Sequence, residues 1–265
     1  MTIRFLCIFG MPRTASSHVN KLINSCSNFA GKGELFHRHA AGQSRPIEIA
    51  ALNEASDGVV VDSESFRKWR RDHPLQTLEA LHSAWKKRKT IAFKVFPSHL
   101  SHELIEAELL PRDDIAFAIL KRRPIESFVS SVKAKGGAKY TLTDTTDIKP
   151  EISPEEFLEW ARRMRAWYKW VRDTLDARGK PYAEISFEEH LDGYSAHDAL
   201  AHLRDLFTPL GIKNFDKFKE DAAEGTRQDR ETDYRKRVAN WDEFEAALRA
   251  KPQPSRMLNW AERIP

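Results

Sequence analysis

The chain begins with a strand, a tight turn and a helix, and this order constrains its fold more than any other feature. An apolar run from Ile3 to Phe9 is typical of a buried strand, and it ends at Gly10 and Pro12. Over residues 16–26 the apolar spacing becomes helical. A turn of this kind brings the unpaired N–H groups and the positive dipole end of a helix next to a strand end. The sequence therefore predicts an anion-binding loop.

The side chains of this loop narrow the choice of anion. They supply one fixed cation and three hydroxyl groups: Arg13, Thr14, Ser16 and Ser17. Counted from Gly10, residues 15–17 stand where a nucleoside-triphosphate P-loop has Gly-Lys-Ser/Thr, but they read Ala-Ser-Ser. The lysine that reaches the β- and γ-phosphates is therefore missing. The loop suits a smaller anion, held without a metal ion, better than a nucleoside triphosphate.

A second basic turn follows another apolar run, residues 115–120. It reads Lys121-Arg122-Arg123-Pro124 and opens a segment with helical spacing, in which Ser130 lies eight residues after Arg122. An arginine holds a phosphate through a fork of donors, and a serine about two turns into the helix can add another. Both basic turns follow strands, so we expect them at the carboxyl ends of strands in one parallel sheet.

Together the two turns resemble the motifs of sulfotransferases that use 3′-phosphoadenosine 5′-phosphosulfate (PAPS), in particular the bacterial trehalose- and nodulation-type branch. In that family a Pro-Lys/Arg-Ser/Thr-Gly-Ser/Thr-Ser/Thr loop binds the 5′-phosphosulfate, and here residues 12–17 read Pro-Arg-Thr-Ala-Ser-Ser. A strand, Arg-Asn-Pro and a serine eight residues after the arginine bind the 3′-phosphate. The chain departs from these patterns at Arg123 and at Ala15, where glycine is usual. A positive φ at Ala15 would cost energy.

A third segment near the C-terminus resembles the family's basic loop over the 3′-phosphate and adenine. It contains Arg227-Gln228, then the basic run 234–237, then Asn-Trp-Asp-Glu at residues 240–243. The resemblance implies nucleotide contacts from Arg227 and Gln228. It leaves open whether Arg235 or Arg237 contributes one, since a charged surface helix is the alternative for each.

The resemblance also implies the chemistry. Sulfuryl transfer needs positive charge at the leaving group and a base for the acceptor's proton. Arg13 stands where the family has its loop cation, and it can stabilise charge but not donate a proton. Glu34 matches a Glu-Leu/Phe-Phe segment of the bacterial branch. His99, five residues after Lys94, stands near the histidine base of the cytosolic enzymes, at a longer spacing. We favour Glu34 as the base, and His99 stays the alternative.

Composition is consistent with one enzyme domain over residues 1–265. The net charge of +4 and the pI near 9.0 favour electrostatic attraction of an anionic nucleotide. Basic residues do not alternate with aromatic ones in long runs, so we expect no nucleic-acid partner. Cys7 and Cys26 fit core positions rather than a metal site, and no metal is expected. Without a secretory signal or an apolar run of membrane length, we expect a cytoplasmic protein.

Strand-like and helical segments alternate along the chain. Strands are expected at residues 3–9, 91–96, 115–120 and 182–187, and helices at 16–26, 75–85, 101–110, 124–132 and 154–175. Val59–Val61 is a further short apolar run. This alternation predicts an α/β fold of three layers, with a central parallel sheet flanked by helices and a P-loop-like 5′-phosphosulfate loop after the first strand.

The predicted activity is transfer of a sulfuryl group from PAPS to a hydroxyl or amine, with adenosine 3′,5′-bisphosphate (PAP) as product. The acceptor implied by the resemblance is a carbohydrate or another small molecule, and the oligomeric state, a homodimer included, stays open. Two rival functions remain. One is a P-loop-like phosphotransferase that uses ATP and Mg²⁺, and the other is a nucleotide-binding module without catalysis.

Overall fold

The computed structural model describes residues 2–38, 45–61, 63–86, 89–135, 144–213, 215, 218–219, 229 and 231–250. The chain forms two compact units, and we describe each by itself. The first unit consists of residues 1–11, 15–121 and 170–224. The second consists of residues 12–14, 122–169 and 225–265. That the whole chain acts as one sulfotransferase domain stays a prediction.

A five-stranded parallel sheet forms the centre of the first unit, in the order β2-β3-β1-β4-β5. The strands are β1 (Phe5–Phe9), β2 (Phe29–Gly31), β3 (Thr90–Val95), β4 (Ile115–Lys121) and β5 (Tyr182–Ser186). In this register Phe9 pairs with Val95 and with Ile119. The carboxyl ends of β1, β3 and β4 therefore meet at one edge of the sheet, where ligands of open α/β sheets bind.

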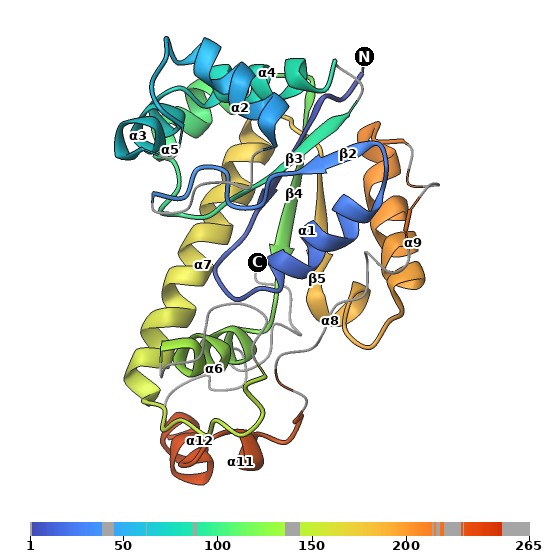
Figure 1. The fold of residues 1–265 in the computed structure, drawn as a ribbon. Coiled ribbons are helices and arrows are strands. Elements are labelled where there is room, and N and C mark those ends of the chain that lie inside the picture. Colours follow the sequence, from blue (N-terminus) through green and yellow to red (C-terminus); the bar gives the residue numbers. More distant parts are fainter. Residues whose placement is uncertain are drawn as a thin grey trace. The chain divides into compact units, whose positions relative to one another are not determined.

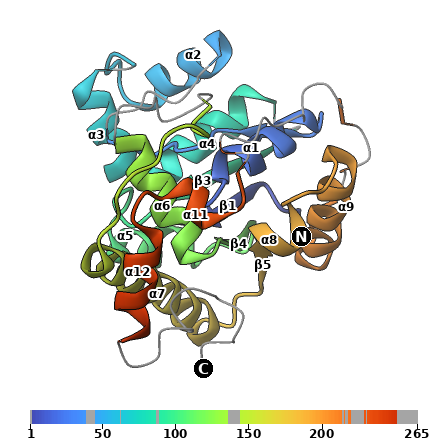
Figure 2. The same cartoon turned by 90° about the horizontal axis from the view of Figure 1, so that it is seen from below.

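Helices cover both faces of this sheet, which confirms the predicted α/β class. Because side chains alternate along a strand, Leu6 packs with α1 (Ser16–Ser25) and α9 (Ala196–Phe207) in one apolar cluster. The neighbouring Phe5 turns to the other face, where its ring contacts His82 of α4 (Pro74–Ala84). Figures 1 and 2 both show α1 and α9 on one side of the strands and α4 on the other.

The remaining elements of the first unit are short. They are α2 (Pro46–Ala55), α3 (Glu64–Asp72), α5 (His102–Leu104), a π-helical turn (Ile105–Leu109), α8 (Phe187–His190) and a 3-10 turn (Thr208–Leu210). The apolar run 59–61 forms no strand, and Val60 is 71% exposed. Sequence patterns also missed β2, α2 and α3. The three residues of β2 are too few to show a period, whereas α3 begins at a detectable cap, the Ser63 hydroxyl, which accepts from the Phe66 N–H.

The second unit has its own small core. It contains α6 (Pro124–Lys135), α11 (Tyr234–Arg237), α12 (Trp241–Arg249) and residues up to 169 of the long helix α7 (Pro154–Ala177). Apolar side chains from these elements pack together: Ile125, Phe128, Val129, Ile152, Phe157, Ala161, Val238, Trp241, Phe244 and Leu248. This core fixes the start of α6, which carries the second basic turn.

Three predictions about the chain as a whole can be compared with the structure. Cys7 and Cys26 are buried and unbridged, which confirms them as core residues. In the part of the chain that the structure describes, no helix has the length and apolar character needed to cross a membrane. Within the same residues no group of three His, Cys, Asp or Glu side chains is placed to hold a metal ion.

Candidate functional site

In the second unit, the two basic turns predicted from the sequence lie against each other. Arg13 Nε donates a hydrogen bond of 3.0 Å to the hydroxyl of Ser130 on α6. Arg122 Nη1 donates to the carbonyl oxygen of Arg13 at 3.3 Å, and the Ser127 hydroxyl lies 3.5 Å from the same oxygen. Side chains that are more than a hundred residues apart in sequence therefore form one basic cluster. Two guanidinium groups and two hydroxyls at one place suit a phosphate or sulfate group.

A mostly buried carboxylate, Glu126, holds the second turn in place. Glu126 accepts from Arg122 Nη2 at 3.2 Å, from both terminal nitrogens of Arg237 at 2.8 and 3.1 Å, and from the Tyr234 hydroxyl at 2.6 Å. Burial alone would raise the pKa of Glu126. The hydrogen bond from Arg237 and the charges of Arg122 and Arg237 outweigh burial and lower this pKa to about 2. The side chain therefore stays ionised and restrains both arginines.

The structure places the predicted C-terminal residues differently from one another. Arg237 is 2% exposed and also donates to Asp229 through Nε at 3.0 Å, so it is held within buried ion pairs. Arg235 is exposed, and its nearest partner is Asp242, at 2.8 Å. Arg227 and Gln228 lie outside the described residues. Within the second unit, Arg237 thus anchors its segment to α6, while Arg235 lies at the surface.

The backbone of the first loop has an unusual conformation for residues with side chains. Arg13 has φ 67° and Ala15 has φ 62°, both in the left-handed region, whereas Thr14 between them has a negative φ. Left-handed residues of this kind occur in the backbone turns that direct successive N–H groups toward an anion. Ala15 caps α1 with φ 62° and ψ 21°, and its side chain offers no capping hydrogen bond. The positive φ that would make alanine costly is therefore present.

Lys94 is a further candidate site residue of the first unit, which sequence reasoning did not select. It lies on the α1-facing side of β3, is 4% exposed, and donates through Nζ to the Ser16 hydroxyl at 3.1 Å. Its Nζ also lies 3.7 Å from Glu34 Oε1. Burial lowers the pKa of Lys94, and the Glu34 charge opposes that shift. The available signal was a lone lysine in an otherwise apolar strand, residues 91–96.

The two candidate bases belong to one cluster in the first unit. Glu34 follows Gly33, whose φ of 58° favours glycine and whose N–H donates to Asn20 Oδ1 of α1 at 3.0 Å. The Glu34 side chain is 36% exposed, whereas His99 is 2% exposed. Glu34 Oε2 lies 3.6 Å from His99 Nε2. The cluster therefore offers one accessible carboxylate beside one buried imidazole.

The charges around Glu34 keep it ionised. Burial raises the pKa of Glu34, but the nearby Nε2 donor of His99, the positive charge of Lys94 and the neighbouring imidazoles of His99 and His37 together lower it below the ordinary value of 4.5. A carboxylate in this state can accept a proton at neutral pH.

The remaining hydroxyl groups of the first loop differ in their exposure to solvent. Thr14 is buried in the second unit, whereas Ser17 is exposed in the first.

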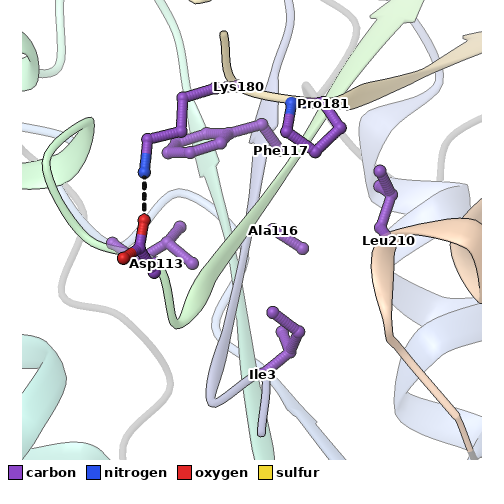
Figure 3. A pocket seen from close by; sticks show the side chains of 8 residues that line it. Ile3, Asp113, Ala116, Phe117, Lys180, Pro181 and Leu210 are labelled. Atoms are coloured by element: carbon purple, nitrogen blue, oxygen red, sulfur yellow. Dashed lines mark hydrogen bonds and ion pairs between the residues drawn. The ribbon is translucent and has the colours of Figure 1, made fainter. Parts of the chain in front are cut away.

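A small pocket of the first unit lies away from these residues. Figure 3 shows it among Ile3, Ala116, Phe117, Pro181 and Leu210, with Lys180 and Asp113 joined by an ion pair of 2.7 Å. Its volume is about 150 Å³. It lies at the amino ends of β4 and β5, whereas the basic turns follow the carboxyl ends of strands. We assign it no ligand.

Comparison with known proteins gives little further information. No protein-family model matches the chain, and no curated protein matches it. Among solved structures it is similar to the sulfotransferase domain from the Synechococcus PCC 7002 olefin synthase, with 14% sequence identity and a TM-score of 0.42. That match covers 100% of this chain and 97% of the other. A likeness at this level carries no argument, so the functional conclusion rests on the residues described above.

Proposed function

We propose that this protein is a sulfotransferase that moves a sulfuryl group from PAPS to a hydroxyl or amine of a small-molecule or carbohydrate acceptor. The observation that carries the proposal is the meeting of Arg13, Arg122 and Ser130 in one hydrogen-bonded cluster. A donor with phosphate groups at both the 3′ and 5′ positions of one ribose needs two such anion-binding turns. A nucleoside triphosphate would need the loop lysine that this chain lacks.

The residues present fit the anionic groups of this donor. The alternating backbone of residues 13–15 and the cation of Arg13 would hold the 5′-phosphosulfate. Arg122 and Ser130 would hold the 3′-phosphate, with Glu126 fixing Arg122. In the proposed site PAPS supplies the sulfuryl group, and no metal ion is required.

Catalysis by this chain then needs one base and fixed positive charge. Glu34 is the better base because it is ionised and partly exposed, whereas His99 is almost fully buried. Glu34 would take the proton of the acceptor hydroxyl as the acceptor oxygen bonds to sulfur. The bond from sulfur to the phosphate oxygen breaks, and its electron pair leaves with PAP. Arg13 would stabilise the negative charge that develops there, and Lys94, 3.7 Å from Glu34, would help to keep the base ionised.

Nucleotide binding tests the first half of the proposal. Thermal unfolding is measured with PAP, with PAPS and with ATP plus Mg²⁺, the first two in EDTA. We expect PAP and PAPS to raise Tm without metal and ATP with Mg²⁺ to have no effect. The Arg122→Ala variant should lose most of that rise. Arg162→Ala, which removes an exposed arginine that pairs with Glu159 of the same helix, α7, should keep it.

Turnover tests the proposed transfer of the sulfuryl group to an acceptor. Transfer of labelled sulfate from PAPS is screened against hydroxylated sugars and small alcohols. Glu34→Gln should reduce kcat by about 10²- to 10⁴-fold, as expected for loss of a general base, while PAP binding persists. Equal stabilisation by ATP with Mg²⁺ would instead indicate a phosphotransferase. PAP binding without turnover on any acceptor would indicate a binding module.

A further inference from the structure

We infer that His99 serves as a fixed hydrogen-bond donor that positions the Glu34 carboxylate, and that it is not the base. This inference rests on the proposed function, because it assigns a role within that site. It follows from the way the chain surrounds the two ring nitrogens. His99 is therefore a positioning residue, and Glu34 alone exchanges the proton.

The Nδ1 atom of His99 receives a hydrogen bond from the backbone. The Phe96 N–H points at Nδ1 with a distance of 3.2 Å, and a backbone N–H can only donate. Nδ1 must therefore present its lone pair, which leaves the single proton of the neutral ring on Nε2. The Lys94 carbonyl oxygen also lies 3.3 Å from Nδ1 and would favour the other tautomer.

The Phe96 N–H determines the tautomer of His99 more strongly than the Lys94 carbonyl oxygen does. A proton on Nδ1 would turn two N–H groups toward each other where both Phe96 and His99 are buried. An orphaned buried N–H is rarer in proteins than an under-satisfied carbonyl, which has two lone pairs. The Nε2–H tautomer is therefore the one that this environment selects.

The proton on Nε2 is directed at the proposed base. Nε2 is buried and has no hydrogen-bond partner in the described part of the chain, and Glu34 Oε2 lies just beyond that range, at 3.6 Å. A movement of less than 1 Å would close this gap, and hydrogen bonds at active sites often tighten when substrate binds. Closing this gap would give the buried Nε2–H of His99 a hydrogen-bond acceptor.

The same geometry explains why Glu34 keeps a free lone pair for the acceptor. Oε2 faces His99 and Oε1 faces Lys94, while a carboxylate has about four acceptor positions. His37, whose ring meets that of His99 edge-on at 5.6 Å, also acts to lower the pKa of Glu34. Neither ring nitrogen of His99 has a free lone pair, because Nδ1 accepts the hydrogen bond from the Phe96 N–H and Nε2 carries the proton.

Two amide variants separate positioning from base catalysis. In His99→Gln the side-chain amide nitrogen reaches about the place of Nε2, so it can still donate to Glu34. In His99→Asn the shorter amide can accept from the Phe96 N–H but cannot reach Glu34. We expect kcat of His99→Asn to fall by roughly ten- to a hundredfold, as for misplaced catalytic groups, with little change in KM.

The conservative variant provides the decisive comparison. We expect kcat of His99→Gln to exceed that of His99→Asn by about tenfold, and only His99→Asn to shift the acid limb of the pH profile upward, because Glu34 loses its donor there. Lys94, His99 and His37 are the titratable groups that act on Glu34 in the described residues. Equal loss in both variants would overturn the inference, since neither amide can serve as a base.

A measurement without substrates completes the test. Long-range ¹H–¹⁵N correlation spectra of the wild-type protein with labelled histidine report which ring nitrogen of His99 carries the proton. We expect a proton on Nε2, and a proton on Nδ1 would overturn the inference while leaving the sulfotransferase proposal intact. A protein with the Nε2–H tautomer and no turnover from PAPS would contradict the proposed function instead.

Discussion

Replacing Ala15 by glycine should stabilise the protein, although glycine usually weakens the interior of a helix. Ala15 has φ 62° and ψ 21°, a left-handed conformation that costs a residue with a Cβ about 1–2 kcal/mol. Glycine removes this strain. Glycine also increases the conformational entropy of the unfolded chain, and this lowers the free energy of unfolding by about 0.4–1 kcal/mol. The net expectation is a gain of about 0.5–1 kcal/mol.

Thermal unfolding can resolve a change of this size. With an unfolding entropy of about 2.1 cal/mol/K per residue, a chain of 265 residues should gain about 1–2 °C in Tm. Ala50→Gly is the matched control, because Ala50 is exposed in the helical backbone of α2. That change should lose about 1 kcal/mol and lower Tm by about 2 °C. If Ala15→Gly lowers Tm as Ala50→Gly does, the left-handed conformation of the loop is refuted.

Three further predictions concern charged residues. Glu126→Gln breaks a buried ion cluster and should lower the free energy of unfolding in urea by about 3 kcal/mol, whereas a loss under about 1 kcal/mol would contradict that role. Because the pKa of Glu34 is lowered below 4.5, kcat/KM should stay level from about pH 8 to 5 and fall only below 4.5. A fall centred near pH 6.5, which is typical of an imidazole, would contradict the assignment of Glu34 as the base. Lys94→Met should reduce kcat about 100-fold in the sulfate-transfer assay, and unchanged kcat would exclude its electrostatic role.

The parallel sheet and its edge were predictable because their signals are local. Buried parallel strands are nearly continuous apolar runs, and the runs at 91–96, 115–120 and 182–187 became β3, β4 and β5 with small shifts at their ends. The turn after β1 was equally visible, since Pro12 and the hydroxyl pair mark the passage from strand to helix. The three-residue β2 left no such pattern, because its pairing with β3 defines it.

Residues that act through distant partners could not be found in this way. The sequence shows Glu126 as one of many helical carboxylates, and only the fold brings Arg237 and Tyr234 to it. Arg237 and Arg235 have the same side chain and nearly the same position in sequence, yet one is buried in ion pairs and the other is exposed. Sequence spacing alone does not distinguish them.

Isothermal titration of the protein with PAP and with adenosine 5′-monophosphate, without metal, tests most directly that Arg122 and Arg13 serve one doubly anionic nucleotide. We expect wild-type protein to bind PAP at least about tenfold more tightly than the monophosphate, as a charge-assisted phosphate contact of 1.5–3 kcal/mol requires. In Arg122→Ala the two affinities should become nearly equal through loss of PAP binding alone. Equal affinities in the wild type, or an equal loss of both ligands in the variant, would contradict the account.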